Sequence, residues 1–346
     1  MTDSPKRINS FEWLRALACV AVVLIHVSEG VMASHAVSEA GLPRAAAWAL
    51  GQVVLCRWAV PVFFMMSGAL LLDPGKGAGW GRVRRYASRM AGVLATFGLA
   101  FCLMEAVMDG GGLSPAAVAG ALANLLAGRS WAHMWYVYAL LGIYLLLPAI
   151  HAYAASASRR DLRVALCVLF CCTLVAPTVG DLSGVQVDTL IWVTSSVFWF
   201  VLGRYAWEWL RLDGRMVALG IASVVATCVM QFAALSAGSW GNFLRSPSFA
   251  IAAPWALLVF LAAKERLERE PPRPVLAVAR LSFGVYLLHP VFLNVMQKVL
   301  LWVPWEGAWA STPPLAFEAV EFAIAFAGSL AVSALLRRVP GFRRLI

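Results

Sequence analysis

Ten apolar stretches, each long enough to cross a membrane, dominate this sequence. They lie near residues 11–31, 48–72, 89–108, 134–151, 163–180, 189–207, 216–237, 248–264, 281–303 and 315–336. A helix needs about 20 mostly apolar residues to cross the hydrocarbon core of a bilayer, so each stretch is expected to form one transmembrane helix. A chain surrounded by lipid must satisfy its own backbone hydrogen bonds, which favours helices. The sequence therefore predicts an all-α, polytopic membrane protein of about ten transmembrane helices.

The composition agrees with that prediction. Hydrophobic residues make up 61% of the chain and charged residues only 13%, whereas soluble domains carry about 25% charged residues. The 15 Trp residues suit the interfaces between membrane and water. We expect residues 1–346 to form a single integral-membrane domain without a separate soluble domain.

The distribution of basic residues predicts the orientation in the membrane. The net charge is +10, and most of the 28 Lys and Arg residues fall on one side if the N-terminus is cytoplasmic. The outer loops then contain Arg44, Arg129 and Arg245. By the positive-inside rule, both termini are expected in the cytoplasm, which agrees with an even number of helices. No basic stripe accompanies a nucleic-acid-binding motif, so no nucleic-acid partner is expected.

The first apolar stretch contains three ionisable residues, Glu12, Arg15 and His26. At 100° per residue, Arg15 and His26 project from one helix face about 16 Å apart, and Glu12 can pair with Arg15 at a spacing of three. Ionisable side chains are costly in hydrocarbon and often mark functional sites. This stripe suits a ligand that enters from the cytoplasm and reaches deep into the membrane. The alternative is structural: an interfacial ion pair and a histidine that bonds a neighbouring helix.

The second predicted helix contains Arg57, Pro61 and Ser67. Arg57 is expected at a depth similar to that of His26, where it either contacts the reacting groups or extends towards the outer surface. Pro61 interrupts the backbone hydrogen bonds and can expose carbonyl groups to a cavity. We expect Ser67 to line that cavity.

Five more candidate residues lie in the fourth and ninth predicted helices. His133, Trp135 and Tyr136 come at the outer end of the fourth helix. An aromatic anchor at the interface is the favoured interpretation there, and contact with an acceptor or an oxyanion is the alternative. Tyr286 and His289 lie near the middle of the ninth helix. A buried, hydrogen-bonded His289 that shapes the cavity is favoured over a second catalytic base.

Several chemistries have no signature in this sequence. It contains no metal-ligand spacing, no Walker loop, no GxGxxG and no GxSxG motif. All seven Cys residues lie in apolar stretches without CxxC spacing, as is typical of packing residues. We therefore expect neither a metal ion nor a permanently bound cofactor.

Five segments occur in an order that resembles the acyltransferase-3 family of integral membrane acyltransferases. They are Phe11–Arg15 with His26, Val60–Gly68, Arg82 with Arg85, Trp135-Tyr136 with Tyr144–Pro148, and Ser282–Pro290. The resemblance covers nearly the whole chain. Among family members, the chain is most similar to stand-alone sugar O-acetyltransferases, such as the type that modifies enterobacterial common antigen. Glu12 stands where many members have Asp, which keeps the carboxylate.

The resemblance implies a function and a set of roles. Acetyl-CoA would be the cytoplasmic donor, and a hydroxyl of a glycan or lipid-linked saccharide would be the acceptor, in a bacterial inner membrane. His26 would be the catalytic histidine, acting as general base or acyl carrier, with Arg15 and Glu12 at the donor end. Arg82 and Arg85 would contact the CoA phosphates. The alternatives are transfer of another acyl group, such as succinyl, and a transporter or flippase for polysaccharides or lipid-linked sugars; no inverted repeat supports transport.

Overall fold

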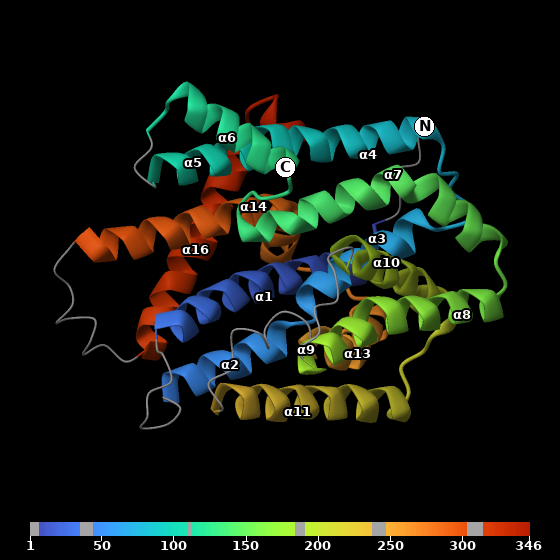
Figure 1. Ribbon diagram of the computed structural model, residues 1–346. Coiled ribbons are helices and arrows are strands. Elements are labelled where there is room, and N and C mark those ends of the chain that lie inside the picture. The colour runs from blue at the N-terminus through green and yellow to red at the C-terminus, as the bar shows by residue number, and fades with distance from the viewer. Residues whose placement is uncertain (1–6, 35–43, 109–111, 184–190, 237–246, 303–313) are drawn as a thin grey trace.

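The computed structural model describes residues 7–34, 44–108, 112–183, 191–236, 247–302 and 314–346, and these residues form helices without any strand (Figure 1). The α-helices are α1 (Asn9–Ser34), α2 (Arg44–Cys56), α3 (Ala59–Leu71), α4 (Trp80–Val93), α5 (Leu99–Met108), α6 (Pro115–Leu126), α7 (Trp135–Ser156), α8 (Arg159–Phe170), α9 (Ala176–Ser183), α10 (Ile191–Trp209), α11 (Gly214–Ser236), α13 (Pro247–Arg266), α14 (Arg273–Trp302) and α16 (Pro314–Leu336). Two π-helical turns (Leu94–Gly98 and Cys171–Val175) and two 3-10 turns (Ala132–Met134 and Phe342–Arg344) complete these elements.

Each of the ten predicted segments corresponds to one or more of these elements, apart from terminal residues outside the described ranges. The segment 48–72 is divided into α2 and α3 by a break at residues 57–58. Within the described residues, eight stretches are long and apolar enough to cross a membrane. They are Asn9–Gly30, Leu50–Leu71, Trp80–Met108, Ala132–Ser156, Arg159–Gly180, Gly214–Ala233, Arg273–Met296 and Ala316–Leu336. The two other predicted spans correspond to α10 and α13, with 19 and 20 residues. The prediction of an all-α, polytopic membrane protein is confirmed.

Two helices begin earlier than the sequence predicts. The connections were expected near residues 73–88 and 265–280, but α4 begins at Trp80 and α14 begins at Arg273. In α4, the apolar side chains of Val83, Met90 and Val93 are buried while arginines occupy the other faces. Such a stretch forms an amphipathic helix, so it extends the membrane span instead of looping away from it.

Helix α6 occupies a region where a loop was expected between the third and fourth spans. Its N-terminus has favourable local chemistry, because the Ser114 hydroxyl accepts a hydrogen bond from the amide of Ala117 and a proline follows at the first helical position. Figure 1 shows α6 returning beside α5 as a helical hairpin. The Ser130 hydroxyl then donates to the carbonyl of Gly98 at 3.1 Å. Gly98 lies ten residues before the end of α5, which is about 15 Å along the helix axis. The chain therefore approaches α7 about 15 Å deeper in the bundle than the end of α5.

Helix α1 lies in the middle of the bundle (Figure 1) and packs against α2, α3, α13, α14 and α16. Most of its apolar side chains are buried, including Leu14, Ala18 and Val23. The stripe that carries Arg15 and His26 is therefore surrounded by other helices, and only a cavity between helices could give a ligand access to it.

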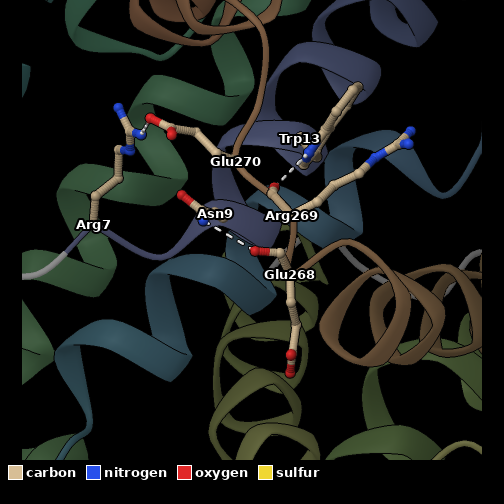
Figure 2. A network of polar contacts seen from close by, with 6 residues as sticks. All are labelled: Arg7, Asn9, Trp13, Glu268, Arg269 and Glu270. Atoms are coloured by element: carbon tan, nitrogen blue, oxygen red, sulfur yellow. Dashed lines mark hydrogen bonds and ion pairs between the residues drawn. The ribbon is translucent and has the colours of Figure 1, made fainter.

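Polar contacts fix the first turns of α1 to the connection between α13 and α14 (Figure 2). Arg7 forms an ion pair with Glu270 at 2.8 Å. The Asn9 amide donates to the carbonyl of Glu268 at 3.0 Å, and the Trp13 indole donates to that of Arg269 at 3.2 Å. These contacts fix the height of α1 and therefore the positions of Glu12 and Arg15.

Helices α3 and α10 cross at backbone contact. A Cβ atom added to Gly68 would lie 1.7 Å from the carbonyl oxygen of Phe200, and one added to Gly203 would lie 2.0 Å from that of Met65. Small residues allow this approach, as is common between membrane helices. The crossing fixes α3, which continues the chain from Arg57.

The α3–α10 crossing leads to a stability prediction. Because backbone atoms cannot move aside as a flexible side chain can, Gly203→Ala is expected to destabilise the protein by about 1–3 kcal/mol. Gly120→Ala in α6 is the matched control, since nothing lies within 4 Å of an added Cβ there. Thermal unfolding in detergent can be measured by size-exclusion chromatography of heated samples. The midpoint temperature of unfolding should be lower for Gly203→Ala and not for Gly120→Ala. Equal midpoints for the two variants would contradict the backbone contact.

Candidate active site

His26 in α1 is paired with a carboxylate from the next turn of the same helix. Its Nδ1 lies 3.3 Å from an Oε atom of Glu29. An ionised carboxylate can only accept, so in a neutral His26 this contact favours the proton on Nδ1 and a lone pair on Nε2. The side chains of His26 and Glu29 remain 32% and 31% exposed. His26 therefore has the orientation and accessibility that a general base requires.

Arg57 forms the next link of this network. Its guanidinium lies 3.6 Å from the other Oε atom of Glu29, and its side chain is 11% exposed. Arg57 sits at the break between α2 and α3, directly before the first turn of α3 that contains Pro61. Proline has no N–H, so it cannot bond the carbonyl four residues earlier, and the helix is interrupted there. Arg57 thus points into the protein and compensates the charge of Glu29; it does not extend outward.

Two further histidines lie beside His26. The ring of His289 stacks on that of His26 with centroids 5.1 Å apart, and the ring of His133 lies 6.0 Å from that of His289. His289 is completely buried and its Nδ1 lies 3.0 Å from the carbonyl of Val285. A carbonyl only accepts, so Nδ1 of His289 donates and its Nε2 carries a lone pair. The Nε2 atoms of both His289 and His133 are buried without a hydrogen-bond partner among the described residues.

The structure corrects the interpretation of His133 as part of an interfacial anchor. His133 is 5% exposed, and the hydroxyl of Tyr286 donates a hydrogen bond to its carbonyl oxygen. Its ring also packs against Phe101 at 5.4 Å. The reason is the α5–α6 hairpin, which returns the chain to the middle of the bundle before α7 begins. The sequence gives no apolar stretch of spanning length there, so the depth of His133 could not be predicted.

Aromatic residues form one wall of the site. Tyr136 is buried, and its ring packs on Phe64 at 4.7 Å and on Tyr286 at 5.3 Å. The ring of Trp135 also lies 6.2 Å from that of Phe64. Tyr136 is therefore an interior residue, which also corrects the interfacial interpretation. The Ser67 hydroxyl donates to the carbonyl of Phe63 at 2.9 Å, within α3.

An arginine-rich cavity of about 900 Å³ opens at the end of the bundle where α1 begins. Its basic lining residues come from α1, α4, α14 and the segments before α1 and after α16; they are Arg7, Arg15, Arg85, Arg89, Arg280, Arg337, Arg343 and Arg344. Glu12 also lines it, and its carboxylate accepts a hydrogen bond from Arg15 at 2.7 Å. The predicted Glu12–Arg15 pair is confirmed. Arg15 and His26 thus join this cavity to the histidine cluster along one helix.

The two arginines expected to act together at the donor end differ in their relation to the cavity. Arg85 lines the cavity, whereas Arg82 is not among its lining residues. One terminal nitrogen of Arg82 is buried without a partner among the described residues. At a spacing of three along α4, the two side chains are only about 60° apart around the helix axis. They therefore occupy neighbouring positions, of which Arg85 alone lines the cavity.

Sequence reasoning missed several residues of this site. Glu29 lies one turn after His26, and that spacing was the available signal. Glu318 in α16 was also missed; its carboxylate accepts hydrogen bonds from Ser28 and Gln52, both at 2.7 Å. His151 in α7 is also buried, with its Nε2 3.1 Å from the carbonyl of Asp73. The fifth histidine of the chain, His35, lies outside the described residues.

The described residues contain no group of three or more His, Cys, Asp or Glu side chains that could hold a metal ion. No curated protein and no solved structure matches the chain. Residues 8–338 match the sequence family described as an acyltransferase domain, acyltransferase 3. Because this match covers nearly the whole chain and the fold is a multi-pass helical bundle, the protein belongs to the acyltransferase-3 family and is a membrane acyltransferase.

Proposed function

We propose that this protein is an O-acetyltransferase that moves an acetyl group from acetyl-CoA to a hydroxyl of a glycan or lipid-linked saccharide. The observation that carries the proposal is the Glu29–His26 pair, which presents an imidazole lone pair inside the membrane domain. The same helix carries Arg15 into the arginine-rich cavity. A phosphate-binding end and a general base thus lie along one face of α1.

The donor is proposed to enter at the arginine-rich end, which would face the cytoplasm of a bacterial inner membrane by the positive-inside rule. Guanidinium groups suit phosphate oxygens because of their charge and paired donors. Arg15 and Arg85 would contact the phosphates of CoA. The pantetheine arm would then extend along α1 and place the thioester near His26, about 16 Å from Arg15 along the helix axis.

The proposed reaction is a direct acyl transfer. The Nε2 atom of His26 removes the proton of the acceptor hydroxyl while that oxygen forms a bond with the thioester carbonyl carbon. The tetrahedral intermediate then expels the CoA sulfur as its C–S bond breaks, and the proton on His26 passes to the thiolate. The products are the acetyl ester and CoA. No net proton is released, so His26 returns to its starting form.

The remaining residues have supporting roles in the proposal. Glu29 holds the His26 ring and stabilises the imidazolium that forms during the reaction, and Arg57 compensates the charge of Glu29. Positive charge from Arg57 or Arg15 would stabilise the oxyanion. His133, Trp135 and Tyr136 would contact the acceptor, while Ser67, Tyr286 and His289 shape the cavity.

Replacing the proposed base tests the function. Membranes containing the wild-type protein should transfer radiolabelled acetyl from acetyl-CoA to a glycan or lipid fraction, and His26→Ala at matched expression should lose about 100-fold or more of this activity. The measurement is label incorporation across several native acceptor extracts. A wild-type protein that neither transfers label nor binds CoA would contradict the proposal and favour the transport alternative.

Removing the charge of Glu29 tests its role in orienting His26. Glu29→Gln keeps the shape of the side chain, so kcat should fall by about 100-fold while KM for acetyl-CoA changes by less than about threefold. Glu105→Gln is the control, since it removes an exposed carboxylate from α5. If both variants had the wild-type kcat, the Glu29–His26 pair would have no part in catalysis.

Incubation with the donor alone distinguishes direct transfer from an acetyl-histidine intermediate. Direct transfer predicts no label on the purified protein when radiolabelled acetyl-CoA is supplied without an acceptor. Steady-state kinetics should then show sequential and not ping-pong behaviour. Label that appears on the wild type but not on His26→Ala would show instead that His26 carries the acetyl group.

A further inference from the structure

The arginine-rich cavity contains more positive charge than its own contacts use. Glu12 is paired with Arg15, Arg89 donates to the carbonyl of Leu345 at 3.0 Å, and Arg337 donates to that of Arg280 at 2.7 Å. The guanidinium groups of Arg343 and Arg344 make no hydrogen bond or ion pair with the other described residues. A cavity of about 900 Å³ with this excess of charge suits a ligand that carries several phosphates.

The segment that contains Arg343 and Arg344 is held in a fixed position by its contacts. Residues Phe342–Arg344 form a 3-10 turn, and the Phe342 ring packs edge-on against Phe97 at 5.8 Å. Gly92 in α4 leaves room for Leu345, because a Cβ added there would lie 2.8 Å from the Leu345 side chain. With the Arg89 hydrogen bond to Leu345, these contacts fix the segment against α4. The two arginines are therefore part of the cavity wall.

We infer that Arg343 and Arg344, together with Arg280, bind the phosphorylated nucleotide end of the CoA donor. This inference rests on the proposed function and adds the residues that recognise the donor. The 3′-phosphate and diphosphate of CoA would occupy the part of the cavity formed after α16 and at α14. The pantetheine arm would then lead past Arg15 towards His26. Arg82 does not line the cavity, so the inference does not include it.

A basic surface at the cytoplasmic end of membrane helices also arises from topology alone. Neighbouring arginines outside the cavity can distinguish phosphate binding from a role in membrane orientation. Arg84 and Arg338 lie beside Arg85 and Arg337 in the sequence, but neither lines the cavity. Replacing them removes the same net charge from the same end of the bundle. The double variant Arg84→Ala/Arg338→Ala is therefore a matched control for Arg343→Ala/Arg344→Ala.

The experiment measures equilibrium binding of CoA and of pantetheine to the full-length protein in nanodiscs of neutral lipid. Arg343→Ala/Arg344→Ala should weaken CoA binding by about tenfold or more, because charge-assisted contacts to phosphate are lost. The control should bind CoA like the wild type. Pantetheine lacks the nucleotide, so its binding should be the same for all three proteins.

Other outcomes would overturn the inference. Equal CoA affinities for the test and control variants would show that the two arginines only contribute to the orientation of the protein in the membrane. Weakened binding of both CoA and pantetheine would indicate a general disruption of the cavity. If CoA affinity were unchanged and only the amount of anionic phospholipid that copurifies with the protein fell, the arginines would bind lipid headgroups. Because binding is measured without turnover, these results are independent of whether the wild type transfers acetyl groups.

Discussion

The site depends on the pairing of ionisable side chains away from water. A charge in hydrocarbon costs several kcal/mol unless it is paired or hydrated. Here one carboxylate oxygen of Glu29 lies 3.3 Å from Nδ1 of His26, and the other lies 3.6 Å from the guanidinium of Arg57. Arg57 is positively charged, and His26 becomes so when it is protonated. This pairing lets α1 keep a histidine lone pair deep in the bundle. Glu29 thus contributes both to the orientation of His26 and to the charge compensation of the buried Arg57.

The fold supplies the rigidity that this network requires. Contacts with the α13–α14 connection fix the start of α1, and Glu318 holds Ser28 near its other end. The backbone contact between α3 and α10 fixes the helix that follows Arg57. The α5–α6 hairpin brings His133 to the same depth as His289. Helices from distant parts of the sequence thus converge on one cluster of histidines.

The sequence predicted the features that depend on local pattern. Apolar length predicted the helical segments, and helical periodicity predicted both the Glu12–Arg15 pair and the shared face of Arg15 and His26. Features that depend on tertiary packing were not predicted. The depth of His133 results from α6, a 12-residue helix too short to be recognised as a span. The arginines after α16 join the cavity through contacts with α4, which is more than 200 residues away in the sequence. Arg82 and Arg85 seemed equivalent in the sequence, but only Arg85 lines the cavity.

The most direct test of the account is an experimental structure of the protein in a nanodisc with a non-transferable acetyl-CoA analogue. We expect phosphates among the arginines of the cavity, a pantetheine arm along α1, and the carbonyl group of the analogue within reach of Nε2 of His26. An analogue bound elsewhere, or one whose carbonyl lay far from His26 while its phosphates filled the cavity, would contradict the proposed link between donor site and catalytic base.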